Sequence, residues 1–383
     1  MDLIYLDNNA TTRPAPEVVA EMLPFLTELF GNPSSTYRFG QRARQAVDEA
    51  RAKVAALVGC SEGELLFTGG GTESINTAIR GLLAMRSPRR KIVTSTVEHS
   101  ACRELCQQLA REGAETVAVP VGLDGALDID QLRRAIDEQT ALVSIMWANN
   151  ETGVIFPVEE IADICRAKKV PFHCDATQAI GKLPVDFHGA GVDAASFAAH
   201  KFHGPKGVGA LFIRRGLRIS PLLIGGPQER GRRGGTENVA GIAGIGKAAE
   251  LAGMHLPEMG RVGKLRDQFE QAILDSIPSS QVNGDRQRRV ANTTNIGFER
   301  LEAEAILLLL SEKGVCASAG SACSSGSLDP SPVILAMGVD EKIAHGAIRF
   351  SLSRYTTVAE IDAAIAIVPG VIDRLRAVLP VGV

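Results

Sequence analysis

The chain has 383 residues, of which 45% are hydrophobic, and a formal net charge of −3 at pH 7. This length predicts two or three domains with large cores, and the balanced charge gives no sign of nucleic-acid binding. The apolar stretch 305–310 is far too short to span a bilayer, and the N-terminus lacks the pattern of a signal peptide. The seven cysteines, an odd number, indicate free thiols in a reducing compartment, so we expect a cytoplasmic protein.

Short apolar runs alternate with helical patterns between residues 65 and 213. Strands are expected at 65–68, 92–96, 116–119, 141–146, 172–175, 194–197 and 208–213, and helices at 101–111, 128–137, 158–167 and 237–254. This alternation predicts an α/β domain built on a mostly parallel, seven-stranded sheet. A polar break at 255–263 then leads to a smaller C-terminal α/β domain.

A glycine-rich turn follows the first expected strand at residues 69–71, and Thr72 opens helix-forming sequence. Backbone N–H groups at such a helix start can surround a phosphate. The spacing differs from GxxxxGK[ST] and from GxGxxG, so a single phosphate is favoured over a nucleotide. A tight turn without a ligand would show the same glycines.

Two polar residues follow other expected strands. His99 could stack on an aromatic ring or move a proton near neutral pH, although a histidine at such a position, taken alone, is more often a hydrogen-bonded structural residue. Asp175 emerges at the carboxyl end of its strand, where open α/β sheets bind ligands. An aspartate there can keep a pyridinium nitrogen protonated, as pyridoxal phosphate (PLP) requires. The alternative for Asp175 is a helix N-cap.

Lys201 lies between two apolar runs, beside His200, in a Gly/Pro-rich turn at the end of an expected strand. A desolvated lysine amine at such a position can form a Schiff base with a carbonyl compound. A surface lysine on a turn is the other interpretation. The glycine turn, His99 and Asp175 together favour the covalent role.

With these motifs assembled, the chain resembles the cysteine desulfurases of the class V PLP-dependent aminotransferases, and most closely the nitrogenase-associated members of group I. The matching motifs follow one another in fixed order at residues 5–12, 31–35, 147–153, 225–238, 320–330 and 348–355. The resemblance implies PLP fold type I. It also implies a large PLP-binding domain of residues 16–255 and a small domain of residues 1–15 and 256–383.

The resemblance further implies that the enzyme removes sulfur from L-cysteine, giving L-alanine and a persulfide on Cys323. Cys323 lies among glycines and small residues, which are typical of an exposed, mobile loop. A thiol on such a loop is accessible as a thiolate nucleophile. An exposed cysteine without a role would look the same outside this motif.

Roles for the remaining site residues follow from the same resemblance. Lys201 would hold PLP and take the Cα proton, and His99 would stack over the ring. The other expected contacts are Asp175 to the ring nitrogen, Gln178 to the ring oxygen, Asn150 and Arg349 to the substrate, and Gly71, Thr72, His200 and Thr236 to the phosphate, with Thr236 supplied by the other subunit of a homodimer. Relatives often carry a serine where this chain has Ala198, which puts one phosphate contact in doubt.

An iron–sulfur scaffold protein, in nitrogen fixation or housekeeping assembly, is the implied acceptor of the persulfide. The alternatives are a selenocysteine lyase or another class V aminotransferase, and a non-catalytic sulfur- or metal-binding platform. His99, Cys102 and Cys106 have ligand-like spacing, but no CxxC pair marks a structural zinc site. We therefore expect no metal site.

Overall fold

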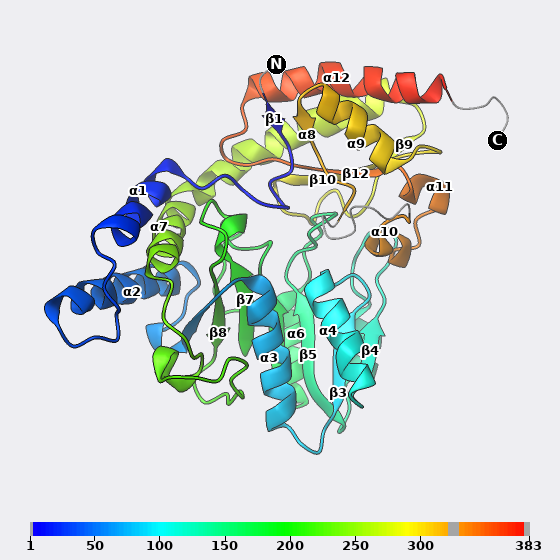
Figure 1. The fold of residues 1–383 in the computed structure, drawn as a ribbon. Helices are drawn as coiled ribbons and strands as arrows, with labels where there is room; N and C mark the ends of the chain where they lie inside the picture. The colour runs from blue at the N-terminus through cyan, green and yellow to red at the C-terminus, as the bar shows by residue number, and fades with distance from the viewer. Residues whose placement is uncertain (1–2, 321–328, 379–383) are drawn as a thin grey trace.

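A seven-stranded sheet lies at the centre of the computed structural model, which describes residues 3–320 and 329–378 (Figure 1). Its strand order is β2-β8-β7-β6-β5-β3-β4. The strands are β2 (Leu65–Thr68), β3 (Lys91–Ser95), β4 (Glu115–Val119), β5 (Thr140–Met146), β6 (Phe172–Asp175), β7 (Ala194–Ala198) and β8 (Gly209–Ile213). β8 runs antiparallel to β2 and β7, whereas the other pairs are parallel. The mostly parallel sheet expected from the sequence is confirmed.

Helices cover this sheet because each presents an apolar face to it. They include α3 (Gly71–Met85), α4 (Ser100–Arg111), α5 (Ile129–Ala135), α6 (Val158–Ala167) and α7 (Val239–His255). In Figure 1, α3 and α4 lie over one face of the sheet, and their apolar residues share a cluster with β3 and β5. Asp128 and Asn238 cap α5 and α7 by accepting backbone N–H groups. These side chains set the starts of the two helices.

The C-terminal part builds a second, antiparallel sheet of order β12-β10-β9 (Figure 1). Its elements are β9 (Ser280–Val282), β10 (Thr293–Phe298) and β12 (Ala347–Ser351), with helices α8 (Met259–Ser276), α9 (Ala303–Glu312), α10 (Pro332–Ala336), α11 (Glu341–Ala344) and α12 (Val358–Arg376). A separate apolar cluster fills the space between this sheet and α8, α9 and α12. The molecule therefore has two main cores, one for each sheet.

The N-terminal segment joins the C-terminal part. β1 (Ile4–Tyr5) pairs in parallel with β11 (Val315–Cys316), and Asp7 forms a bridge with Ser351 of β12. The chain then passes to α1 (Pro16–Thr27) and α2 (Arg38–Leu57), which pack on α7. Residues 6–12 consequently run between the two sheets.

The prediction of a polar break at residues 255–263 is wrong in part. α7 continues to His255, and α8 already begins at Met259. Gly260, Arg261 and Gly263 suggested a loop, but Val262 is buried in the second core. Tertiary packing of that apolar face overrides the weak local propensity.

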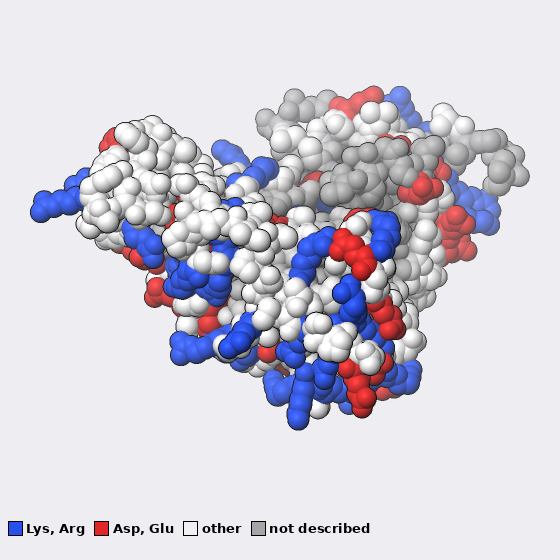
Figure 2. Space-filling model, turned by 60° about the horizontal axis from the view of Figure 1, so that its bottom comes forward, with Lys and Arg blue, Asp and Glu red and all other residues white. Residues whose placement is uncertain are grey.

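Positive and negative side chains are interspersed over the face that Figure 2 presents. The left-hand lobe, where α1 and α2 lie in Figure 1, carries few charged side chains on this face. Within residues 3–320 and 329–378, we find no helix of the length and apolarity needed to cross a membrane.

Candidate active site

A cavity of about 240 Å³ opens at the carboxyl ends of the parallel strands, between the two sheets. This is the edge where open α/β sheets bind ligands. Most of the residues predicted for the site line it: Gly71, Thr72, His99, Asn150, Asp175, Gln178, His200, Lys201 and Arg349. The structure thus brings together predicted residues that are up to 278 positions apart in the sequence, from Gly71 to Arg349.

The glycine turn forms one wall of the cavity. Gly70 has φ = 150°, a value that favours glycine, and α3 begins at Gly71. A Cβ built on Gly71 would lie 3.5 Å from Thr177 Oγ1 and 3.6 Å from the Cβ of Ala198. A side chain at Gly71 would therefore fill space that the helix N-terminus leaves for an anion.

His99 lies at the N-cap of α4 and is held in one tautomer. The backbone N–H of Ala101 donates to His99 Nδ1 at 3.1 Å, so Nδ1 is unprotonated and the ring proton of the neutral form is on Nε2. Burial lowers the pKa of His99, and Lys201 and Arg349 add to that effect against the opposing Asp175 carboxylate. His99 is accordingly neutral near pH 7 and carries its N–H on the nitrogen away from the helix.

Asp175 ends β6 and is 6% exposed. Its Oδ1 accepts a hydrogen bond from the backbone N–H of Thr177 at 3.0 Å, which fixes the carboxylate at the carboxyl end of the strand. The neighbouring His173 bridges β5 and β7 through Ser144 and Ser196, each at 2.8 Å. This hydrogen-bonded layer supports the strand end that carries Asp175.

Lys201 follows β7 in a short 3₁₀ turn (Ala199–Lys201). Its Nζ donates to the backbone carbonyls of Asn9 at 2.7 Å and Ala10 at 2.8 Å. The amine thus lies at the cavity and is held by the segment that passes between the two sheets. Burial lowers the pKa of the adjacent His200 to about 4, with Lys201 as the next cause.

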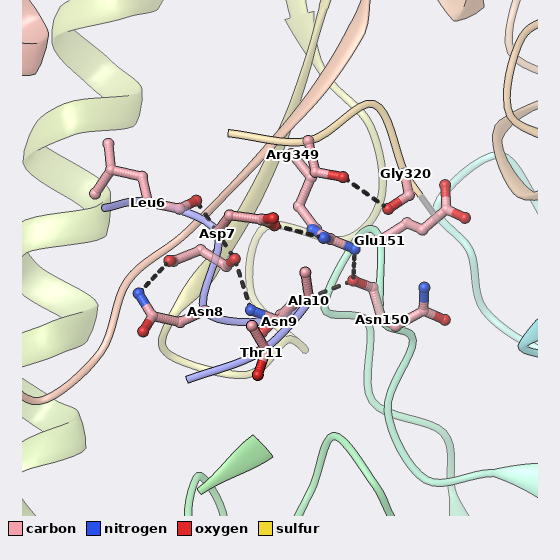
Figure 3. Close-up of polar contacts among 12 residues, drawn as sticks. Leu6, Asp7, Asn8, Asn9, Ala10, Thr11, Asn150, Glu151, Gly320 and Arg349 are labelled. Atoms are coloured by element: carbon pink, nitrogen blue, oxygen red, sulfur yellow. Dashed lines mark hydrogen bonds and ion pairs between the residues drawn. The ribbon is translucent and has the colours of Figure 1, made fainter. Parts of the chain in front are cut away.

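Arg349 forms the opposite wall from within β12, where it is 2% exposed (Figure 3). One guanidinium nitrogen donates to the Asn150 carbonyl at 3.0 Å, and the other pairs with Asp7 at 2.7 Å. Arg349 Nε and Asn150 Oδ1 are buried and have no hydrogen-bond partner among the described residues. Buried polar atoms without partners are costly, so both atoms point to a polar ligand in the cavity.

Of the two remaining predicted residues, the structure describes only one. Thr236 lines a separate pocket of about 110 Å³ with Thr68, Gly69 and Asn238. Cys323 lies outside the residues that the structure describes. Their predicted roles stay predictions.

Sequence reasoning missed other residues that line the cavity or reach it. Asn9 and Ala10 come from the segment that runs between the two sheets, and Thr177 presents a hydroxyl beside Ala198. Thr177 could have been predicted from the sequence, because it lies between Asp175 and Gln178 in a motif that was already noted. Asn9 belonged to a noted motif as well, but only the folded chain shows its contacts.

Among residues 3–320 and 329–378, no group of three or more His, Cys, Asp or Glu side chains could hold a metal ion. Cys102 and Cys106 are buried on α4, where they pack with Leu105 and Leu109 in an apolar cluster. In this position both cysteines behave as small apolar residues.

Comparison with known proteins gives one consistent result. A model of the aminotransferase class-V family matches residues 4–364. The chain is 52% identical over 380 residues to cysteine desulfurase 2 of Trichormus variabilis. The aligned region covers 99% of this chain and 96% of the relative. It is also 52% identical over 386 residues to a cysteine desulfurase of Cereibacter sphaeroides, covering 100% and 99% of the two chains. A solved NifS-like protein superposes with a TM-score of 0.92 at 39% identity, over 97% of this chain and 100% of that one.

A mainly parallel α/β sheet with a lysine amine, a buried carboxylate and a glycine-lined helix start at one edge defines a PLP-dependent enzyme of fold type I. The unpartnered atoms and the open space at Gly71 fit that cofactor and its substrate. The chain belongs to the aminotransferase class-V family.

Proposed function

We infer that the chain is a PLP-dependent cysteine desulfurase, which takes sulfur from L-cysteine and releases L-alanine. One observation carries this inference: the Lys201 amine, the Asp175 carboxylate and the Arg349 guanidinium line the same cavity. The full-length similarity to cysteine desulfurases supports the same activity. When bound, PLP supplies an electron sink for negative charge that develops at the substrate Cα.

The sheet-side wall would hold the cofactor. Asp175 would pair with the ring nitrogen and keep it protonated, because a buried carboxylate favours a neighbouring cation. Gln178 and His99 would contact the ring, the latter with its face or its Nε2 proton. Gly71, Thr72 and His200 would surround the phosphate, since they line the cavity at the start of α3.

Lys201 would hold the cofactor through its amine and afterwards take the proton from the substrate Cα. The carbonyls of Asn9 and Ala10 orient that amine by accepting hydrogen bonds from it. An amine that is both held and aimed is suited to general-base catalysis. His99, neutral at pH 7, would donate a hydrogen bond from Nε2 without adding a charge to the site.

Arg349 and Asn150 would orient the substrate. A guanidinium binds a carboxylate with two parallel hydrogen bonds, and the Arg349 Nε is available for such a contact among the described residues. Its pairing with Asp7 fixes the direction of the side chain. The α-carboxylate of L-cysteine would therefore lie on the β12 side of the cavity.

Cys323 would be the nucleophile. Its thiolate would attack the substrate sulfur, so that an S–S bond forms while the C–S bond breaks and leaves its electron pair on carbon. The outcome is a persulfide on Cys323 and, after protonation, L-alanine. The described residues before and after Cys323 support this assignment, because they contact residues of the β12 side. Ser318 pairs with Arg349 through both backbone groups, and Ser331 donates to Glu151, the neighbour of Asn150, at 2.5 Å.

We propose a homodimer in which Thr236 of one subunit completes the phosphate site of the other. α1 and the segment after it expose a row of large apolar side chains: Val19 52%, Leu23 55%, Leu26 65% and Phe30 73%. Exposed apolar patches of this kind mark protein contacts. Ile224, which precedes Thr236 in the chain, is 91% exposed and would extend the same interface.

We also propose that the chain divides into a large domain, residues 16–255, and a small domain, residues 1–15 and 256–383. This division is supported by the separate apolar cluster beside each sheet. The persulfide would pass to an iron–sulfur scaffold protein, with nitrogen fixation as the favoured setting. The six described cysteines are all free, which supports a reducing compartment such as the cytoplasm.

The test is a spectrum of the purified protein before and after L-cysteine, with alanine quantified and Cys323 analysed by mass for one added sulfur. We expect a visible cofactor band, alanine formation and a persulfide. Cys323→Ser should keep the band and lose alanine formation, whereas Cys60→Ser, a half-buried thiol away from the cavity, should keep both. Undiminished alanine release by Cys323→Ser would refute the nucleophile, and transamination without sulfur release would favour another class V activity.

A further inference from the structure

A buried lysine outside the proposed machinery lies directly behind the cavity. Lys182 is 7% exposed and occupies the turn after β6, four positions beyond Gln178. Its Nζ donates to Asn9 Oδ1 at 2.8 Å and makes a short contact to Gln178 Oε1. Among the residues in the described ranges, no carboxylate pairs with this amine.

A second, small cavity lies beside Lys182, and its lining also differs from the surroundings of an ordinary ion-paired lysine. This space of about 30 Å³ is lined by Lys182, Lys201, His203, His255 and Arg354, and no acidic residue lines it within the described part of the chain. Burial lowers the pKa of the Lys182 amine well below its usual range, and the nearby charges of Lys201 and Arg349 act in the same direction. Both acceptors that Lys182 contacts are oxygens of uncharged carboxamides, so the amine lies among neutral partners.

Both acceptors lead to the proposed machinery. Gln178 Oε1 has Lys182 as its partner, and Gln178 Nε2 donates to the Asn9 carbonyl at 3.1 Å. The same Asn9 carbonyl accepts the Lys201 amine at 2.7 Å. Lys182 is therefore one contact from the proposed ring ligand and two contacts from the amine that would hold the cofactor.

Asn9 is the centre of this network and is 1% exposed. Its side-chain amide donates to Thr293 Oγ1 at 2.8 Å and the Asn150 carbonyl at 3.2 Å, and its Oδ1 also accepts from Asn292 at 3.0 Å. Contacts from both sheets thus converge on one residue. A side chain that fixes Asn9 can therefore affect the Lys201 amine, which the Asn9 carbonyl also holds.

We propose that Lys182 is a positioning residue of the desulfurase reaction, which fixes the Gln178 carboxamide directly and the Lys201 amine through Asn9. This role rests on the proposed function, because it assigns a purpose to residues that would hold PLP. A small displacement of reacting groups is enough to lower the rate: about 1 Å can cost about 10²-fold. Lys182 would act on kcat rather than on substrate affinity, since it contacts neither Arg349 nor the substrate side.

The test compares Lys182→Met with Lys91→Met in the PLP-loaded enzyme. Lys91 is also buried, at 8% exposure, but it pairs with Asp137 at the opposite edge of the sheet. We expect Lys182→Met to weaken the visible circular dichroism of the bound cofactor and to lower kcat by about 10²-fold with KM unchanged. Lys91→Met should lower only the thermal stability. If Lys182→Met also changes stability alone, Lys182 is a structural residue and the proposal is overturned.

A double-mutant cycle keeps the proposal testable if Lys182→Met folds poorly. Asn9→Ala and Lys182→Gln, alone and combined, are compared by the same circular dichroism signal. Two side chains that act through one contact give non-additive effects, so additive effects would overturn the proposal. The wild-type band and its loss in Lys201→Ala test the proposed function separately. A wild-type protein without the band refutes that function, whereas an unaltered Lys182 variant refutes only this role.

Discussion

The two walls of the cavity are built in different ways. On the sheet side, Asp175 ends β6, while His99 and Lys201 lie shortly after β3 and β7. Neighbouring backbone groups fix His99 and Asp175. On the β12 side, Arg349 depends on Asp7, 342 positions away, and on the Asn150 carbonyl, 199 positions away. The first wall is thus largely local in origin, while the second exists only when distant segments meet. This difference suggests that the sheet side binds the cofactor and the β12 side selects the substrate.

The strongest test of this separation is Lys201→Ala. We expect loss of the visible cofactor band and a fall in kcat of about 10⁴-fold, because the proposed general base is removed. Lys206→Ala is the matched control, since Lys206 is an exposed lysine on the same turn. Absorbance spectra and alanine release measure both effects. Retention of the band and of activity in Lys201→Ala would disprove the assignment of the sheet-side wall.

Arg349→Met tests the other wall. We expect kcat/KM for L-cysteine to fall by the equivalent of about 2–5 kcal/mol, because one partner of a buried charge pair is lost, while the cofactor band persists. Arg289→Met serves as the control: Arg289 is also buried and pairs with Glu270 at 2.6 Å, but it does not line the cavity. This control should lose stability without a change in KM. If Arg349→Met lost the cofactor instead, the two walls would not have separate roles.

Much of the sheet-side wall could be predicted from the sequence, because local patterns determine it. The apolar runs gave the seven strands of the large sheet to within about a residue at most ends, and the polar residues after β6 and β7 pointed to the ligand edge. The β12-side wall could not be predicted in this way. Arg349 was identified only through family resemblance, and nothing local links it to Asp7. The Asn9–Lys182 contact joins residues 173 positions apart, a separation that periodicity does not report.

A third prediction concerns the layer beneath the sheet-side wall. Burial lowers the pKa of His173 to about 4 in the folded protein, from 6.5. The unfolded chain therefore binds more protons below pH 6.5, so His173 contributes stability that is fully present above that pH and is lost as the pH falls toward 4. The unfolding free energy should therefore fall by about 3 kcal/mol between neutral pH and a pH below 4. Urea unfolding of the wild type and His173→Asn between pH 7 and pH 5 should show a steeper loss of unfolding free energy in the wild type. Equal slopes would contradict the buried neutral ring.

Asp7→Ala gives the smallest expected effect and the sharpest distinction within the β12-side wall. Asp7 does not line the cavity, but it holds one guanidinium nitrogen of Arg349 at 2.7 Å. Loss of a hydrogen bond to a charged group costs about 1.5–3 kcal/mol, and because Arg349 keeps its charge, the loss should appear as a higher KM for L-cysteine. Steady-state kinetics and the cofactor spectrum measure the two outcomes. A changed spectrum with an unchanged KM would mean that Asp7 acts on the cofactor through the 6–12 segment, and that local and long-range contacts do not divide between the walls.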